Sequence, residues 1–177
     1  MSPEFVRGSS ADIDRLEPLW LLLHHHHQQL LPGLAPYVDD AHSWSARRHL
    51  YEELLAKPDT VLLLAYADGA DGADGELIGY GLAHVMPTEQ TWVDDTWSTG
   101  PRVGEIESLG VVPEYRGQGV GTALLDELLR LLTADGVDDI VLGVVPGNPA
   151  TRLYERAGFT LTWSYLSRFA GRPGQRA

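Results

Sequence analysis

The segment 116–121, Arg-Gly-Gln-Gly-Val-Gly, constrains the fold of this chain most strongly. An apolar, strand-like run ends near Val112, and a run with leucines at helical spacing begins near Thr122. The order is therefore a strand, a glycine loop and a helix N-terminus. The glycines let backbone N–H groups approach a bulky anion, and the helix dipole adds partial positive charge, so the segment predicts a phosphate-binding loop.

Two familiar phosphate loops do not match this spacing. A Walker loop ends in Gly-Lys-Ser or Gly-Lys-Thr, whereas Gly121 is followed here by Thr122 and Ala123. The dinucleotide fingerprint would need a glycine at position 122. The remaining pattern, Arg116-x-x-Gly119-x-Gly121, is also compatible with an ordinary glycine-rich turn, so the flanking sequence must decide.

Hydrophobic periodicity predicts strands and helices on both sides of the loop. The predicted strands are 4–7, 61–66, 76–86, 103–112, 139–145 and a final run at 159–169. The predicted helices are one that starts at 9–12 and ends before Pro32, followed by 44–55, 122–134 and 150–157. Strand 139–145 should run parallel to strand 103–112, because a helical crossover connects them.

The strand before the loop carries two carboxylates. Alternation along 103–112 places Glu105, Glu107, Leu109 and Val111 on one face of the sheet. The carboxylates of Glu105 and Glu107 are therefore expected to point the same way, and each raises the pKa of the other.

Composition narrows the classes of function. A chain of 177 residues fits one domain, expected at 1–170, with a disordered tail at 171–177. The net charge of −12 argues against nucleic-acid binding and favours neutral or cationic partners. The absence of cysteine excludes thiolate catalysis and cysteine metal sites. No apolar run approaches the ~20 residues of a membrane span, and no secretory signal is visible, so we expect a cytoplasmic protein without a membrane partner.

Two repetitive segments suggest metal sites, but neither has a complete ligand pattern. Only His24 and His27 of the histidine run 24–27 share a helical face, and no third ligand is evident, so a structural or substrate-lining role is expected. The segment 68–75 repeats Asp and Gly without the order of a calcium loop, which favours a flexible hairpin turn. No metal is expected.

Three segments resemble the GCN5-related N-acetyltransferase (GNAT) superfamily in order and spacing. Residues 109–121 resemble its motif A, Asn148 with residues 153–159 resembles motif B, and residues 76–86 resemble the strand that precedes them. The resemblance implies an α+β fold of α/β three-layer type. Its mixed, mostly antiparallel central sheet would have about seven strands, flanked by about four helices and splayed between the fourth and fifth strands.

The resemblance also implies acetyl-CoA as cosubstrate. Residues that match the family's binding positions are Leu109, Gly110 and Val111 for the pantetheine arm, Arg116, Gly117, Gln118, Gly119, Val120, Gly121 and Thr122 for the pyrophosphate, and Asn148 and Tyr154. The chain departs from the family at Asn148, which lies six residues before Tyr154 instead of the usual seven. This departure puts the contact of Asn148 with CoA in doubt.

Two kinds of catalytic residue follow from the resemblance. Tyr154 matches the general acid that protonates the departing thiolate, and a phenol of pKa about 10 is a proton donor at neutral pH. Glu105 lies eleven residues before Arg116, where many members place the base that accepts the amine's proton. Glu107 is the alternative base, and either carboxylate could instead bind a cationic substrate.

The expected reaction is direct transfer of an acetyl group to a primary amine. An acyl-enzyme is not expected, because the chain has no cysteine and no legible Ser-His-Asp arrangement. The acidic charge, the two glutamates and a loop with Trp92 and Trp97 favour a small cationic metabolite or antibiotic as acceptor. The alternatives are a protein N-terminus or lysine, and a non-catalytic acyl-CoA-binding regulatory module. A homodimer is also compatible with the sequence.

Overall fold

The computed structural model describes residues 3–33, 35–67 and 75–169. The turn expected at 68–75 falls, except for Gly75, outside these residues, and the tail expected at 171–177 lies wholly outside them. Within the described ranges, no helix has both the length and the apolar character of a membrane span.

The centre of the fold is a five-stranded sheet with the order β1-β2-β3-β4-β5. Its strands are β1 (Glu4–Arg7), β2 (Thr60–Tyr66), β3 (Leu77–Pro87), β4 (Arg102–Val111) and β5 (Ile140–Leu142). Neighbouring strands from β1 to β4 are antiparallel, whereas β5 runs parallel to β4 as predicted. The helices are α1 (Glu17–Leu30), α2 (Asp40–Leu55), α3 (Val120–Ala134) and α4 (Thr151–Arg156), with short 3-10 turns at Ser10–Leu16, Thr88–Gln90 and Pro113–Tyr115.

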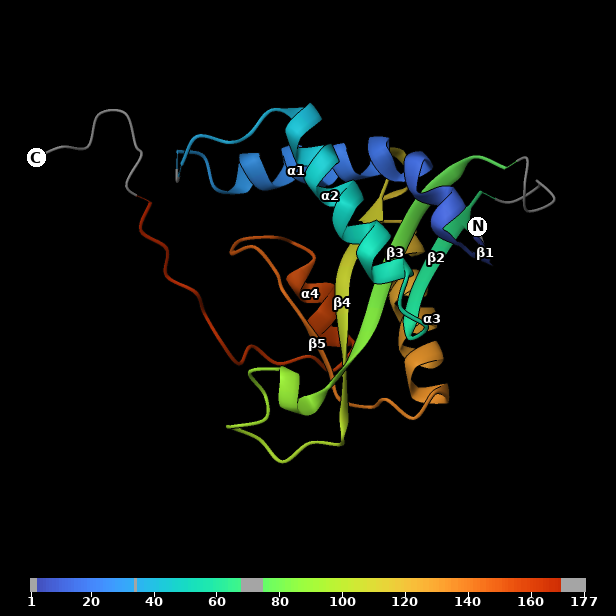
Figure 1. Ribbon diagram of the computed structural model, residues 1–177. Coiled ribbons are helices and arrows are strands. Elements are labelled where there is room, and N and C mark those ends of the chain that lie inside the picture. Colours follow the sequence, from blue (N-terminus) through green and yellow to red (C-terminus); the bar gives the residue numbers. More distant parts are fainter. Residues whose placement is uncertain (1–2, 34, 68–74, 170–177) are drawn as a thin grey trace, which may run out of the picture.

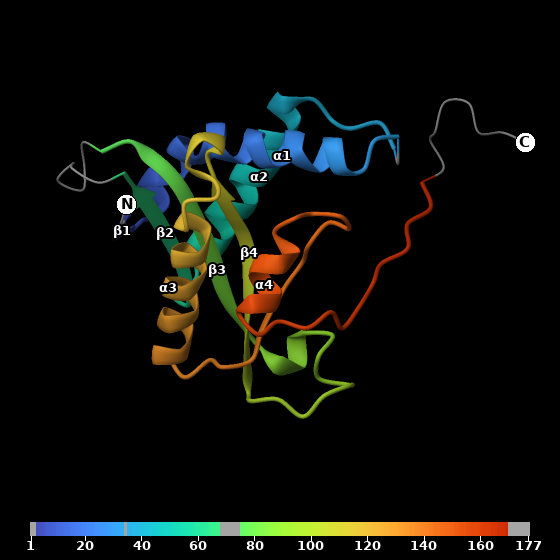
Figure 2. The ribbon, with the colours of Figure 1, turned by 180° about the vertical axis from the view of Figure 1, so that it is seen from behind.

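Helices cover both faces of the sheet, which gives the predicted three layers (Figures 1 and 2). On one face, α1 and α2 bury Leu62, Leu64 and Leu82, while on the other α3 packs on Leu63 and its neighbours. The unbroken apolar run of β2 is thus explained, because a strand covered on both sides needs apolar residues at every position. α2 begins at Asp40, earlier than predicted, because the Asp39 carboxylate caps it by accepting the His42 N–H at 2.8 Å.

The prediction of about seven strands was too high for the described residues. The run 159–169, expected to complete the sheet, has no strand partner there, and Tyr165 and Leu166 are 85% and 100% exposed. Its alternating pattern resembles a strand, but β5, the edge strand of the sheet on that side of β4, is only three residues long and offers a short edge for a ladder.

A bulge in β4 corrects the predicted arrangement of its side chains. Leu82 of β3 lies opposite Ser108 and the next residue lies opposite Ile106, so Glu107 is an extra residue in β4. The extra residue reverses the alternation beyond it. Glu105 and Glu107 point to the same side of the sheet as expected, which is the side of α1 and α2. Leu109 and Val111 pack on the α3 side and do not share the face of the carboxylates.

Gly79 sets the close approach of β3 to the end of β4. A Cβ atom at Gly79 would lie 2.8 Å from the carbonyl oxygen of Gly110, which is main chain and cannot swing away. We expect Gly79→Ala to lower the free energy of unfolding by about 1–3 kcal/mol in chemical denaturation. Gly143→Ala, where an added Cβ meets nothing within 4 Å, should change it by less than about 0.5 kcal/mol. Equal effects of the two substitutions would contradict this packing.

Candidate functional site

Three elements meet where the glycine loop enters α3. A Cβ atom placed on Gly121 would lie 3.7 Å from Cγ2 of Val111 and 3.8 Å from Cδ2 of Leu153. Val111 ends β4 and Leu153 belongs to α4, so the loop, the last residues of β4 and α4 form one junction. The structure thus brings together motif residues that lie up to about 40 positions apart in the sequence.

Conformation explains two of the loop glycines. Gly117 has a φ of 73° and Gly119 a φ of 88°, both in the left-handed region that side chains with a Cβ rarely adopt. A Cβ at either position would touch nothing within 4 Å, so backbone angle and not space selects glycine there. Both residues are exposed, and so is Gln118 between them.

The loop presents unpaired backbone donors. Among contacts to described residues, no N–H group from 117 to 122 makes a hydrogen bond of good geometry, and the first bond of the helix runs from Ala123 N–H to Gly119 O at 2.9 Å. The neighbouring side chains brace the loop: Arg116 Nε donates to Val111 O at 3.0 Å, and Gln118 Nε2 donates to Glu114 O at 2.7 Å. A helix N-terminus with free N–H groups is suited to bind an anion.

β4 has an open edge beside this junction. Its pairing with β5 covers three residue pairs and stops at Ile106 and Leu142, so the strands diverge beyond that point, as the family resemblance implies. From 107 to 111, β4 has β3 along one edge and no described strand along the other. Both ribbon views place α4 beside β4 on this open side (Figures 1 and 2). An extended molecule could pair with the exposed main chain there.

Tyr154 lies in α4 and is partly buried in the same apolar cluster as Leu109 and Val111. Its ring packs edge to face on Phe159, with centroids 6.2 Å apart. Burial raises the pKa of the Tyr154 phenol, which therefore keeps its proton at neutral pH. The hydroxyl forms no hydrogen bond with the described residues, so its proton is available to a ligand.

Asn148 has a structural role before α4. Its Oδ1 accepts the Ala150 N–H at 2.9 Å, and its main-chain oxygen accepts the Thr151 N–H at 3.0 Å. These bonds build the turn that starts the helix, and they occupy one of the side-chain acceptor positions.

The two carboxylates of β4 lie in different surroundings. Glu107 forms an ion pair with Arg47 of α2, and each side chain is 20% exposed. The guanidinium carbon of Arg47 also stacks 3.8 Å from the centroid of the Trp20 ring. Glu107 is thus held by a cation that is itself fixed from two sides.

Glu105 is the less encumbered carboxylate. Burial raises its pKa above the ordinary value of 4.5, and the nearby charge of Glu107 raises it further. His84 lies beside it, with its Nε2 3.5 Å from Glu105 Oε2. A half-buried carboxylate of raised pKa without a cationic partner has the properties of a general base.

Sequence reasoning missed His84. It lies inside the apolar strand β3 opposite Glu105, is 6% exposed, and its Nδ1 is buried without a hydrogen-bond partner. Burial lowers its pKa, and Lys57 adds to that effect while Glu107 opposes it, so the imidazole is neutral at pH 7. The only signal that could have found it is the β3–β4 register, which no local motif reveals.

A buried hydroxyl network fixes the bulge next to these groups. Tyr51 of α2 donates to Ser108 Oγ at 2.7 Å, and its hydroxyl lies 2.9 Å from that of Tyr80 in β3. Burial raises the pKa of both tyrosines, so the network is uncharged. Because Ser108 is the neighbour of Glu107, α2 determines where the carboxylates point.

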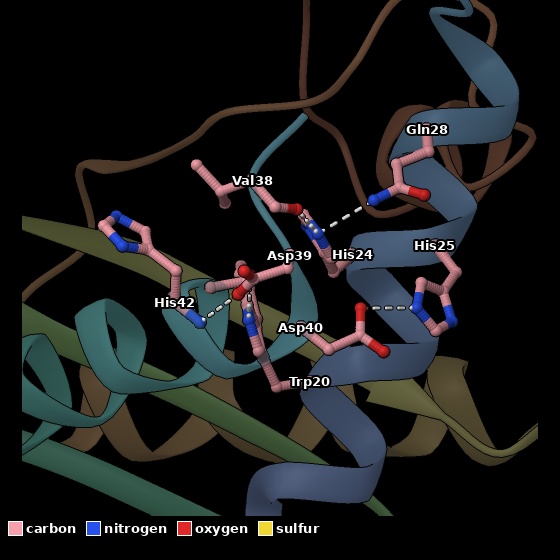
Figure 3. Close-up of polar contacts among 9 residues, drawn as sticks. Trp20, His24, His25, Gln28, Val38, Asp39, Asp40 and His42 are labelled. Atoms are coloured by element: carbon pink, nitrogen blue, oxygen red, sulfur yellow. Dashed lines mark hydrogen bonds and ion pairs between the residues drawn. The ribbon is translucent and has the colours of Figure 1, made fainter. Parts of the chain in front are cut away.

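The histidine run is structural where the structure shows its contacts. Figure 3 shows His25 Nε2 directed at Asp40 Oδ1, 2.8 Å away, which ties α1 to the start of α2. His24 is buried, with Gln28 Nε2 at 2.9 Å and Val38 O at 3.3 Å from its Nε2, of which a single ring nitrogen can satisfy only one. Among the residues described, no group of three or more His, Asp or Glu side chains is placed to hold a metal.

The fold and parts of the sequence match known proteins. The sequence model of the Acetyltransferase (GNAT) family matches residues 23–159. A mycothiol acetyltransferase of Corynebacterium aurimucosum is 35% identical over 85 residues, which are 46% of this chain and 28% of that protein. The match spans less than a third of the length of that protein, and the same holds for a second mycothiol acetyltransferase, from Stackebrandtia nassauensis.

Two solved structures share the fold. One is a putative acetyl transferase from Pyrococcus furiosus, with a TM-score of 0.67, 20% identity and coverage of 94% of this chain and 99% of that one. The other, described as a predicted acetyltransferase with acetyl-CoA from Clostridium acetobutylicum, has a TM-score of 0.66, 20% identity and coverage of 95% and 96%. At such identities the likeness shows the fold alone.

Proposed function

Since the chain belongs to the acetyltransferase (GNAT) family, we propose that it transfers an acetyl group from acetyl-CoA directly to the primary amine of a small cationic molecule. The proposal rests on one junction of β4, α3 and α4. There, among the described residues, the N–H groups at 117–122 are unpaired, one edge of β4 is open and the Tyr154 hydroxyl has no hydrogen-bond partner.

The residues present fit acetyl-CoA. The N–H groups at 117–122, with Arg116 beside them, would hold the pyrophosphate, and the main chain at 109–111 would pair with the pantetheine arm. Asn148 is the weakest of the proposed contacts, because the structure already uses its side chain in a turn. When bound, acetyl-CoA supplies an acetyl group activated as a thioester.

Glu105 and Tyr154 would carry the proton transfers. An alkylammonium has a pKa of about 10.4, so the amine must lose a proton before its nitrogen can attack, and Glu105 accepts that proton. The new C–N bond would form as the C–S bond breaks, with the Tyr154 hydroxyl giving its proton to the departing sulfur. The second proton that the nitrogen loses on becoming an amide would restore the Tyr154 phenol, so that one proton ends on Glu105 and one on the thiol. Glu107, paired with Arg47, would set the local charge and would not act as the base.

Charge and relatives both favour a small cationic acceptor. The net charge of −12 attracts cations and disfavours anionic partners. The matched relatives are named mycothiol acetyltransferases, a name that refers to a small molecule, which supports a small acceptor here. Those proteins are more than three times as long as the matched segment. A protein N-terminus or lysine is the enzymatic alternative. A non-catalytic module is disfavoured because both proton-transfer groups are present.

The pH dependence of kcat/KM tests the assignment of the base. The wild-type rate should fall on the acid side as Glu105 is protonated, with a midpoint above 4.5 because its pKa is raised. Glu105→Gln should lower kcat about a hundredfold and remove this fall in rate on the acid side, the acid limb of the profile. Glu107→Gln should keep activity and move the limb to lower pH, because it removes a negative charge and leaves Arg47 nearby.

Exposed Glu53 on α2 provides the control for this experiment. Glu53→Gln changes a side chain that is 61% exposed and should leave the profile unchanged. If Glu107→Gln abolishes the limb while Glu105→Gln preserves it, the roles of the two carboxylates are the reverse of those proposed.

A further inference from the structure

The connection between β3 and β4 forms an open surface cavity at the end of β4 opposite the glycine loop. The cavity has a volume of about 470 Å³ and is lined by Glu89, Asp94 and Trp97 together with residues 98–101. In Figure 1 this connection is the green and yellow-green segment at the bottom of the view, whereas α3 begins at the other end of β4.

The connection is anchored at both ends. Thr88 N–H donates to Pro101 O at 3.0 Å, and Gly100 N–H donates to Asp139 Oδ2 at 2.6 Å. Val93 at its centre is buried, with 4% exposure. These contacts hold the cavity walls in place without a ligand.

Two carboxylates at the cavity carry uncompensated charge. Glu89 and Asp94 make no ion pair and no side-chain hydrogen bond with any residue that the structure describes. The guanidinium of nearby Arg102 is instead engaged by Asp135, with Nη1 at 3.0 Å from Oδ2. The cavity therefore has a negative potential that attracts a cation.

Trp97 lines the cavity with these carboxylates, and its ring belongs to a group of three tryptophan rings. Trp92, Trp97 and Trp163 have ring centroids 5.6–6.3 Å apart and interplanar angles of 76–88°, so their planes are nearly perpendicular to one another. Their exposures are 40%, 41% and 53%. The cation–π contacts found in the described chain involve Arg15 and Arg47 and none of these three rings. Exposed indole faces beside carboxylates suit an alkylammonium.

The third tryptophan comes from a distant part of the sequence. Trp163 belongs to the run that follows α4, and both ribbon views show this run passing the β3–β4 connection. The contact explains why a run without a strand partner lies where it does. It also links the cavity to the segment that carries Tyr154.

The cavity lies within reach of the proposed base. Thr88 is four residues beyond His84 and Pro101 is four residues before Glu105, and His84 pairs with Glu105. Four residues span about 13 Å at ~3.3 Å each, and most of this span runs along the paired strands, which end at Pro87 and Arg102. An extended molecule could place one end at Glu105 and the other in the cavity.

On the basis of the proposed acetyl transfer, we propose that this cavity binds a second ammonium group of the acceptor. The substrate is then a diamine or polyamine. One amine nitrogen is deprotonated by Glu105 and acetylated, while a distal ammonium is held by the carboxylates of Glu89 and Asp94 and by the face of Trp97.

Comparing kcat/KM for diamines and monoamines of different length tests this inference. We expect kcat/KM to be higher for α,ω-diaminoalkanes than for n-alkylamines of equal length, with an optimum at a nitrogen separation near ~13 Å. In the double variant Glu89→Gln, Asp94→Asn this preference should fall about tenfold or more, while kcat/KM for the monoamines stays the same. Asp95→Asn is the matched control, because Asp95 is exposed next to Asp94 but does not line the cavity.

Binding without turnover separates the two proposals. Titration of the full chain with a long diaminoalkane should quench tryptophan fluorescence, and Trp97→Leu and the double carboxylate variant should both weaken this binding. If the diamine binds in this way but no amine is acetylated, the proposed reaction fails and the cation site stands. If amines are acetylated with the same preference in wild type and in the double variant, the cation site is wrong and the reaction stands.

Discussion

Replacing Tyr154 with phenylalanine should lower kcat for amine acetylation about a hundredfold or more and leave the affinity for acetyl-CoA almost unchanged. The phenol belongs to α4 at the junction with the glycine loop, and burial raises its pKa so that it stays protonated at neutral pH. Because its hydroxyl makes no hydrogen bond within the described residues, the substitution removes no structural contact. The thermal midpoint of unfolding should therefore not fall. Steady-state kinetics and calorimetric titration with acetyl-CoA measure the two effects separately.

Tyr115→Phe is the matched control for this substitution. The Tyr115 hydroxyl lies close to the glycine loop and donates to Glu76 Oε2 at 2.9 Å. The substitution therefore removes a phenol hydroxyl near the same junction without changing α4. Activity should stay near the wild-type value. A Tyr154→Phe variant with unchanged kcat would show that the departing thiolate needs no proton from Tyr154.

Gly119→Asp should abolish measurable binding of acetyl-CoA while leaving the fold intact. The new carboxylate would stand among the free N–H groups where the pyrophosphate is expected, and a repulsion of about 3 kcal/mol or more corresponds to a loss in affinity of over about a hundredfold. Aspartate is one of the few residues that tolerate the left-handed backbone found at this position, where φ is 88°. Calorimetry with acetyl-CoA measures the loss.

Two variants separate charge from backbone strain. Gly119→Asn has nearly the same shape without the charge and should retain most of the affinity. Gly136→Asp introduces the same charge at another left-handed glycine, with a φ of 75°, at the far end of α3, and should leave binding unchanged. Equal affinities of the Gly119→Asp variant and the wild-type protein would place the pyrophosphate elsewhere.

Local sequence signals were sufficient for the framework of the site. The glycine loop was predictable because the residues that carry the left-handed angles, Gly117 and Gly119, are adjacent in sequence to the helix they precede. The strands β1 to β4 and the helices were predictable for the same reason, since their periodicity is a property of each segment alone. The parallel direction of β5 followed from the length of its connection.

The features that the sequence did not predict depend on contacts between distant segments. The bulge at Glu107 reverses the alternation of β4, and it is fixed by Tyr51 through Ser108 and by Arg47, both from α2. His84 could not be identified without the register that places it opposite Glu105. The run 159–169 has the alternation of a strand, but a strand also needs a neighbouring edge, which sequence does not reveal.

Release of the CoA thiol in the presence of amines is the most direct test of the proposed activity. The wild-type protein should bind acetyl-CoA in calorimetry and release one thiol for each acetylated amine found by mass spectrometry, with the fastest rate for cationic amines. Binding of acetyl-CoA with no release above the rate of uncatalysed hydrolysis, for any amine or peptide tested, would contradict an acetyltransferase and favour a non-catalytic CoA-binding module.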